Sequence, residues 1–411
     1  MEFSLTDEQA MICDAAADVL AERSASADVR RALEQSAGRD DALWAALSAE
    51  LGWIALALPE AAGGLGLGAV EQTVLMEQLG RRIACVPYFS TACLAATALA
   101  GCAETPLAKD WLARIGEGAG SATLALPVDL PTVLRSLPVV AEETAGGYAL
   151  SGTLEQVIDG ARADLLLVPA RIANEGQSIG LFAIDAATVS GLKVMPLDTL
   201  DATRPIARVV FDDTRVSRDA LLAGRHATQV LERTAWFAAL ALAAEQLGGA
   251  QQCLDLTLDY TSQRVQFGRA IASFQAVKHR CAQMMVLIES TRSAVLGAAH
   301  AWDAEAGSVV PSDALRADIA AAKSVANDAY AFCAQEAIQL HGGVGFTWEY
   351  DPHLYFKRAQ ASGAQFGSTP QLLEWIASHA IDGAASHRDE AFVPPAAVGS
   401  RPSAARAGAL Q

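Results

Sequence analysis

The fold is decided by the stretch Arg264-Val265-Gln266-Phe267-Gly268, which interrupts a long run of helical sequence. On both sides of it, apolar residues recur at the three- to four-residue spacing of a helix, and Gly268 and Pro311 break that spacing. A second stretch, Gln339-Leu340-His341-Gly342-Gly343-Val344-Gly345-Phe346, ends the pattern with three glycines. The pattern between these breaks predicts three long helices, over 229–264, 273–303 and 313–340.

The pattern of apolar and turn-forming residues changes twice between the two termini. Residues 1–120 carry helical periodicity, which begins with a capping-box spacing between Thr6 and Gln9. From 121 to 225, short runs rich in Val and Leu alternate with Gly, Pro and Asp, a pattern typical of an antiparallel β-barrel or sandwich. Residues 226–382 return to helix, and the Ala/Pro/Gly/Ser-rich segment 383–411 is expected to be a disordered tail. The predicted fold class is α+β, mainly α, with a helical, a β and a second helical domain.

Composition limits the possible functions. The 411 residues include 30 Lys and Arg against 47 Asp and Glu, a net charge of −17, and such an acidic surface repels nucleic acid. The seven cysteines contain neither a CxxC pair nor a metal-ligand spacing, so no metal site is expected. The first residues do not form a signal sequence, and the richest apolar run, 236–244, is too short to span a bilayer. These features predict a cytoplasmic protein without a membrane span.

Four segments resemble one family, the flavin-dependent acyl-CoA dehydrogenases. The segment 3–9 is similar to the family's first helix, and 51–66 to its second helix and following turn. The two stretches at 264–275 and 339–346 are similar to its most specific signatures. The resemblance covers about residues 1–380 and implies an N-terminal helical domain, a β-domain and a C-terminal four-helix bundle. In that family the bundle is the core of an oligomer, usually a dimer of dimers.

The resemblance also implies a set of FAD contacts. Arg264 offers a permanently charged fork suited to a diphosphate, and in the family the matching Arg reaches the FAD of a neighbouring subunit. Phe267 and Gln275 match positions that contact the adenosine half. The segment that passes close to the diphosphate is matched by Gln339, Gly342 and Gly343, and glycine there removes the Cβ that would block the approach. His341, inside the same motif, is expected to pack or cap rather than to act as a base.

The catalytic base is where this sequence departs from the family. Family members abstract the α-proton of an acyl thioester with a carboxylate while the β-hydrogen leaves as hydride to the flavin. The two positions that carry this carboxylate are matched here by Ala238 and Phe366. Glu245 lies on the same helical face as position 238, in an otherwise apolar run, where burial would raise its pKa toward that of a useful base. Glu245 is therefore the candidate base, and a glutamate hydrogen-bonded inside the bundle or at a seam between subunits is the alternative.

The β-domain departs as well, which leaves three hypotheses for function. The family's flavin-contacting loop and strand are matched by 125–129 and 156–160, and Ile158 stands where a Thr hydroxyl would bond the flavin. The first hypothesis is an FAD-dependent acyl-CoA dehydrogenase that passes electrons to an acceptor such as an electron-transfer flavoprotein. The second is a non-catalytic subunit that completes the FAD site of a hetero-oligomeric dehydrogenase, with a partner supplying the base. The third is a family member performing other flavin chemistry.

Overall fold

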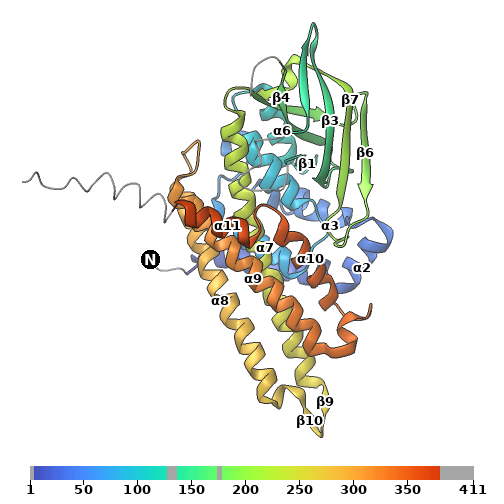
Figure 1. Cartoon of the computed structure of the whole chain (residues 1–411), viewed down its shortest axis with the longest axis vertical. Coiled ribbons are helices and arrows are strands. Elements are labelled where there is room, and N and C mark those ends of the chain that lie inside the picture. The colour runs from blue at the N-terminus through green and yellow to red at the C-terminus, as the bar shows by residue number, and fades with distance from the viewer. Residues whose placement is uncertain (1–3, 127–136, 174–177, 380–411) are drawn as a thin grey trace, which may run out of the picture.

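The computed structural model describes residues 4–126, 137–173 and 178–379. A β-sheet lies at one end of the molecule, and long helices run from it to the opposite end (Figure 1). The predicted tail at 383–411 and part of the predicted flavin loop, residues 127–129, lie outside the described residues. Among the described residues, no helix is both long and apolar enough to cross a membrane.

The N-terminal part is helical, as predicted. Its α-helices are α1 (Asp7–Arg23), α2 (Ser26–Gln35), α3 (Asp41–Ala45), α4 (Ala69–Arg81), α5 (Thr97–Ala100) and α6 (Pro106–Gly116). A π-helical segment, η4 (Phe89–Ala96), runs directly into α5. The predicted capping box is present: the Thr6 N–H donates to the Gln9 side chain at 3.0 Å, and the Gln9 N–H donates to the Thr6 hydroxyl at 3.3 Å. Both orphan donors of the first turn are thereby satisfied.

The β-domain is an open, mixed sheet. Its strands are β1 (Ala122–Leu124), β2 (Val140–Thr144), β3 (Gly147–Ile158), β4 (Leu165–Ile172), β5 (Ile179–Asp185), β6 (Leu192–Leu197), β7 (Ile206–Ser217) and β8 (Leu221–Ala223). Seven of them follow the order β6-β7-β3-β2-β4-β5-β8, and β1 pairs with β4. Most pairs are antiparallel, but β4 pairs in parallel with both β1 and β2.

The described strands do not close on themselves, so the barrel, one of the two arrangements expected, is not formed, and helix packing covers part of the open sheet. The strand β1 is fully buried against η4, where the Thr91 hydroxyl donates to the Ala122 carbonyl at 3.1 Å and accepts from the Ala122 N–H at 3.2 Å. A strand covered by a helix has no exposed ladder that would have to be paired with a further strand.

The C-terminal part confirms the three long helices. They are α7 (Ala227–Gln263), α8 (Gln275–Ala304) and α9 (Asp313–His341), followed by α10 (Pro352–Ala364) and α11 (Thr369–Ala377). A two-stranded hairpin, β9 (Val265–Gln266) and β10 (Arg269–Ala270), links α7 to α8 at the end farthest from the sheet (Figure 1). The helices α7 to α10 form the four-helix bundle, and α4 packs across α7.

The crossing of α4 and α7 is unusually close. A Cβ at Gly80 would overlap the carbonyl oxygen of Glu245, and a Cβ at Gly248 would overlap that of Glu77. Glycine at both positions lets the two backbones touch. This close contact between the two backbones places Glu245 at the point where α4 crosses α7.

Candidate functional site

The two signature motifs meet at one end of the bundle. The helix α7 ends one residue before Arg264, and α9 ends one residue before Gly342. The ring of Tyr260, on the last turn of α7, stacks on the ring of His341 with centroids 4.3 Å apart. This stack holds the ends of α7 and α9 together, although the two motifs are far apart in the sequence.

The side chains of these motifs point away from the core. Phe267 lies at the hairpin turn with φ 55°, and 91% of its surface is exposed. Arg264 is exposed and forms no ion pair within the described ranges. The other expected FAD contacts, Gln275, Gln339, Gly342 and Gly343, are exposed too. We call these six residues the tip.

The glycines of the tip are not required by packing within the chain. A Cβ at Gly342 or Gly343 would meet no atom within 4 Å, and Gly342 has φ 64°. An uncovered backbone on one motif and an exposed guanidinium on the other fit a diphosphate approaching from outside the chain. The residues present therefore fit the FAD contacts that the sequence predicts.

His341 is a packing residue, as expected. Its Nδ1 lies 2.6 Å from the carbonyl oxygen of Ala337, and the ring of Tyr260 stacks on one face of the imidazole. Burial lowers the pKa of His341, an effect that the hydrogen bond to Ala337 only partly opposes. Burial thus disfavours the charged imidazolium at the junction of the two helix ends.

Neither usual base position offers an ionisable group. Ala238 is fully buried in α7, and Phe366 is 1% exposed at φ 51°. The ring of Phe366 meets Phe89 edge to face, with centroids 5.9 Å apart. Aromatic packing therefore surrounds Phe366, one of the two positions that the resemblance matches to the family's carboxylate.

Glu245 is held by two arginines. One of its carboxylate oxygens accepts from Arg204 and the other from Arg358, and only 3% of its side chain is exposed. Arg358 also donates to Asp201 at 2.5 Å and to Thr203 at 2.7 Å. We call these five residues the ion cluster; it joins the loop between β6 and β7 to α7 and α10.

The expected rise in the pKa of Glu245 is wrong. Burial alone would raise it, but the charges of Arg204 and Arg358 and their hydrogen bonds outweigh burial and hold the pKa below its usual range. The cavity beside Glu245, walled by Tyr88, Phe89 and the two arginines, has a volume of only about 10 Å³. Such a space holds about one water molecule and no acyl chain.

The ion cluster is the part of the site that the sequence did not predict. Arg204 and Arg358 are 41 and 113 residues away from Glu245, and no local pattern marks either of them as its partner.

Beside the cluster, Ile158 is buried without a hydroxyl. Its neighbour Asp159 accepts from the Ser90 hydroxyl at 2.6 Å, and burial raises the pKa of Asp159.

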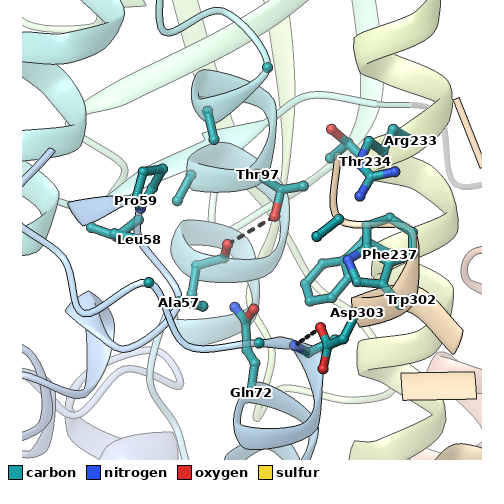
Figure 2. A pocket seen from close by; sticks show the side chains of 18 of the residues that line it. Ala57, Leu58, Pro59, Gln72, Thr97, Arg233, Thr234, Phe237, Trp302 and Asp303 are labelled. Carbon is teal, nitrogen blue, oxygen red and sulfur yellow. Dashed lines mark hydrogen bonds between the residues drawn. The ribbon is translucent and has the colours of Figure 1, made fainter. Parts of the chain in front are cut away.

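A larger cavity lies elsewhere, between the N-terminal helices and the first half of α7. Its volume is about 440 Å³. Figure 2 shows Arg233, Thr234 and Phe237 of α7 on one side of it, beside Trp302 and Asp303 of α8. No residue of the tip or of the ion cluster lines this cavity.

Comparison with known proteins assigns the fold and motifs to one family. Residues 6–119 match the family model "Acyl-CoA dehydrogenase, N-terminal domain", and residues 228–381 match "Acyl-CoA dehydrogenase, C-terminal domain". The chain is 32% identical over 373 residues to acyl-CoA dehydrogenase IpdE2 of Mycobacterium tuberculosis, covering 90% of this chain and 97% of that protein. The chain belongs to the acyl-CoA dehydrogenase family. It is also 32% identical over 376 residues to acyl-CoA dehydrogenase FadE27 of the same organism, with the same coverage of each chain.

Two similar solved structures are each named for a pair of chains. The ChsE4-ChsE5 complex from Mycobacterium tuberculosis contains a chain that matches with a TM-score of 0.80 and 28% identity, over 96% of this chain and 100% of that one. A steroid acyl-CoA dehydrogenase variant, Tcur3481-Tcur3483, matches with a TM-score of 0.78 and 29% identity, over 92% and 99% of the two chains. Butyryl-CoA dehydrogenase from Megasphaera elsdenii, at 24% identity and a TM-score of 0.82, shares the fold.

Family membership makes this acyl-CoA dehydrogenase an FAD-dependent oxidoreductase. When bound, FAD supplies the acceptor for the hydride of the substrate. In this acyl-CoA dehydrogenase the tip provides a cation and open backbone suited to the cofactor's diphosphate, whereas the interior around Glu245 is closed by ion pairs and aromatic rings.

Proposed function

We propose that this chain is the FAD-site-completing subunit of a hetero-oligomeric acyl-CoA dehydrogenase, in which a partner chain supplies the catalytic base. The assembly performs α,β-dehydrogenation of an acyl-CoA thioester. The observation that carries the proposal is the closed interior: Ala238 and Phe366 occupy the base positions, and both oxygens of Glu245 are bound by arginines. A carboxylate in this state has no free oxygen with which to take a proton.

The residues of the tip support the proposed role in completing an FAD site. Arg264 would pair with the diphosphate of FAD, and the backbone at Gly342 and Gly343 would approach it closely. Phe267 and Gln275 would contact the adenosine half. All these groups face outward, so they are suited to a cofactor bound mainly by a neighbouring subunit.

Exposed apolar side chains support an oligomer. Phe267 and Phe346, one on each signature motif, are 91% and 74% exposed. Aromatic side chains are enriched in the cores of protein interfaces, where a partner removes them from water. The heteromeric relatives ChsE4-ChsE5 and Tcur3481-Tcur3483 favour a partner of the same fold over a second identical copy. A dimer of dimers in the cytoplasm, with an electron-transfer flavoprotein as electron acceptor, completes the proposal.

Bound flavin and turnover test this function. The full chain is purified alone and after co-expression with a paralogue that keeps a carboxylate at the base position, and FAD per chain and acyl-CoA oxidation are measured. We expect the lone chain to be inactive with less than one FAD per chain, and the pair to be active. One tightly bound FAD per lone chain, together with dehydrogenation, would refute the proposal. Within the pair, Arg264→Ala should release flavin, whereas Arg215→Ala, an exposed arginine on β7, should not.

Glu245→Gln separates a structural role from a catalytic one. Leaving Arg204 without its counter-charge, and Arg358 with Asp201 alone, is expected to lower the free energy of unfolding by about 3–5 kcal/mol. Turnover per folded pair should stay unchanged. If Glu245 were the base, the variant would instead keep its stability and lose about 10²- to 10⁴-fold in turnover.

A further inference from the structure

The 440 Å³ cavity has the character of a ligand site. Its volume lies within the range of small-molecule pockets, and it has a largely apolar wall contributed by separate parts of the chain. The apolar groups that line it include Ile54, Leu58, Ala96, Val230, Phe237 and Trp302. The exposed lining residues, among them His226 and Val309, place its opening between the start of α7 and the loop that follows α8.

One cation in this wall has spare hydrogen-bonding capacity. The Arg233 guanidinium lies over the ring of Trp302, 4.2 Å from its centroid, and one of its terminal nitrogens, Nη2, donates to the Glu305 carbonyl oxygen at 3.4 Å. The other terminal nitrogen, Nη1, is buried without a partner among the described residues. Arg233 also forms no ion pair with a carboxylate in this part of the chain. A buried N–H donor without an acceptor is costly, and the Arg233 side chain itself lines the cavity.

Among the other polar groups of the cavity, Asp303, Thr97 and Thr234 are already engaged, whereas His226 and Ser308 lie at its exposed opening. Asp303 accepts from the backbone N–H groups of Ala69 and Val70, at 2.6 and 3.2 Å, and so caps α4. The hydroxyls of Thr97 and Thr234 donate to carbonyl oxygens of their own helices (Figure 2). Arg233 is thus the group of this wall best placed to bind an acceptor carried by a ligand.

We propose that this cavity binds a free carboxylic acid with an apolar body, with the carboxylate on Arg233 and the body against Phe237 and Trp302. A single guanidinium suits one carboxylate, which it can bind with two parallel hydrogen bonds. The wall offers no cluster of basic groups of the kind that the several phosphates of a CoA thioester would require. Its occupant is therefore an acid rather than its CoA ester.

Calorimetric titration of the full chain tests the proposal with decanoate, decan-1-ol and decanoyl-CoA as probes. We expect one decanoate per chain, bound at least about tenfold more tightly than decan-1-ol, because a charge-assisted hydrogen bond contributes about that factor. Arg233→Met should abolish the preference for the acid, and Arg233→Lys should restore part of it. Arg215→Met, on the exposed face of β7, is the matched control and should leave binding unchanged.

A second variant covers the case in which Arg233→Met does not fold. Ala96→Leu adds bulk to the cavity wall without touching a charge, and it should weaken decanoate and decan-1-ol alike. Equal binding of acid and alcohol by the wild-type chain would overturn the proposal. So would decanoate binding that survives Ala96→Leu, or decanoyl-CoA that displaces decanoate with the same dependence on Arg233.

Discussion

Lys323 is a fully buried amine in the middle of α9. Its ammonium donates to the side chain of Asn327 and to the carbonyl oxygen of Ser362. Burial lowers the pKa of Lys323 to about 7, although the charge of Glu245 opposes the shift. Lysine in the unfolded chain keeps its proton to about pH 10.4, so the folded state binds fewer protons than the unfolded state between these two values.

Stability is therefore expected to rise with pH above neutrality. The cost of burying the charged amine is fully present below pH 7 and shrinks as the pH rises, by at most about 1.4 kcal/mol per pH unit. Urea unfolding at about pH 6 and about pH 7.5 measures it, below the pH of about 8.5 at which cysteine thiols of the unfolded chain titrate. Lys323→Met should remove this part of the slope, and an identical slope in both proteins would contradict the assignment.

The close crossing of the helices α4 and α7 depends on two glycines, Gly80 and Gly248. Gly80→Ala would drive a methyl group into the Glu245 carbonyl oxygen, so the helices must separate or shift. Overpacking of this kind costs about 1–3 kcal/mol. Gly224→Ala is the matched control, because a Cβ there meets no atom within 4 Å and the variant should stay within about 0.5 kcal/mol of wild type. Thermal unfolding of the two variants compares them, and equal midpoints would show that the crossing tolerates a side chain.

The helices could be predicted from the sequence because their signals are local. Apolar spacing and the breaks at Gly268 and Pro311 define α7, α8 and α9 to within a few residues. The meeting of the two motifs follows from a stack between Tyr260 and His341 that no local pattern encodes. The direction of the pKa shift of Glu245 could not be predicted for the same reason, because it depends on arginines contributed by other elements. Burial was inferred correctly, but the sign of the shift was set by tertiary contacts.

The ion cluster links the β-domain to the bundle at the scale of the whole molecule. Arg358 of α10 binds Asp201 and Thr203 in the loop between β6 and β7, and also Glu245 of α7. All these groups are at least nine-tenths buried, so removing the arginine would leave Asp201 without a cation and Glu245 with Arg204 alone.

Arg358→Met is expected to destabilise the chain by about 3–5 kcal/mol and to weaken the coupling between the two parts. Differential scanning calorimetry should then resolve separate transitions for the sheet and the helices, in place of the joint transition of the wild type. Arg215→Met breaks only an exposed ion pair and should cost less than about 1 kcal/mol. One unshifted transition in Arg358→Met would show that the cluster does not join the domains.

The outward direction of the tip has a genetic consequence. The Arg264 side chain is exposed and forms no ion pair among the described residues, so a copy altered at Arg264 is expected to fold and to enter assemblies normally. Where the tip serves a neighbouring subunit, the defect appears in the active site of a protein whose own gene is intact. In a cell that makes both normal and altered copies, such an allele is expected to behave as dominant, whereas an allele that prevents folding is recessive.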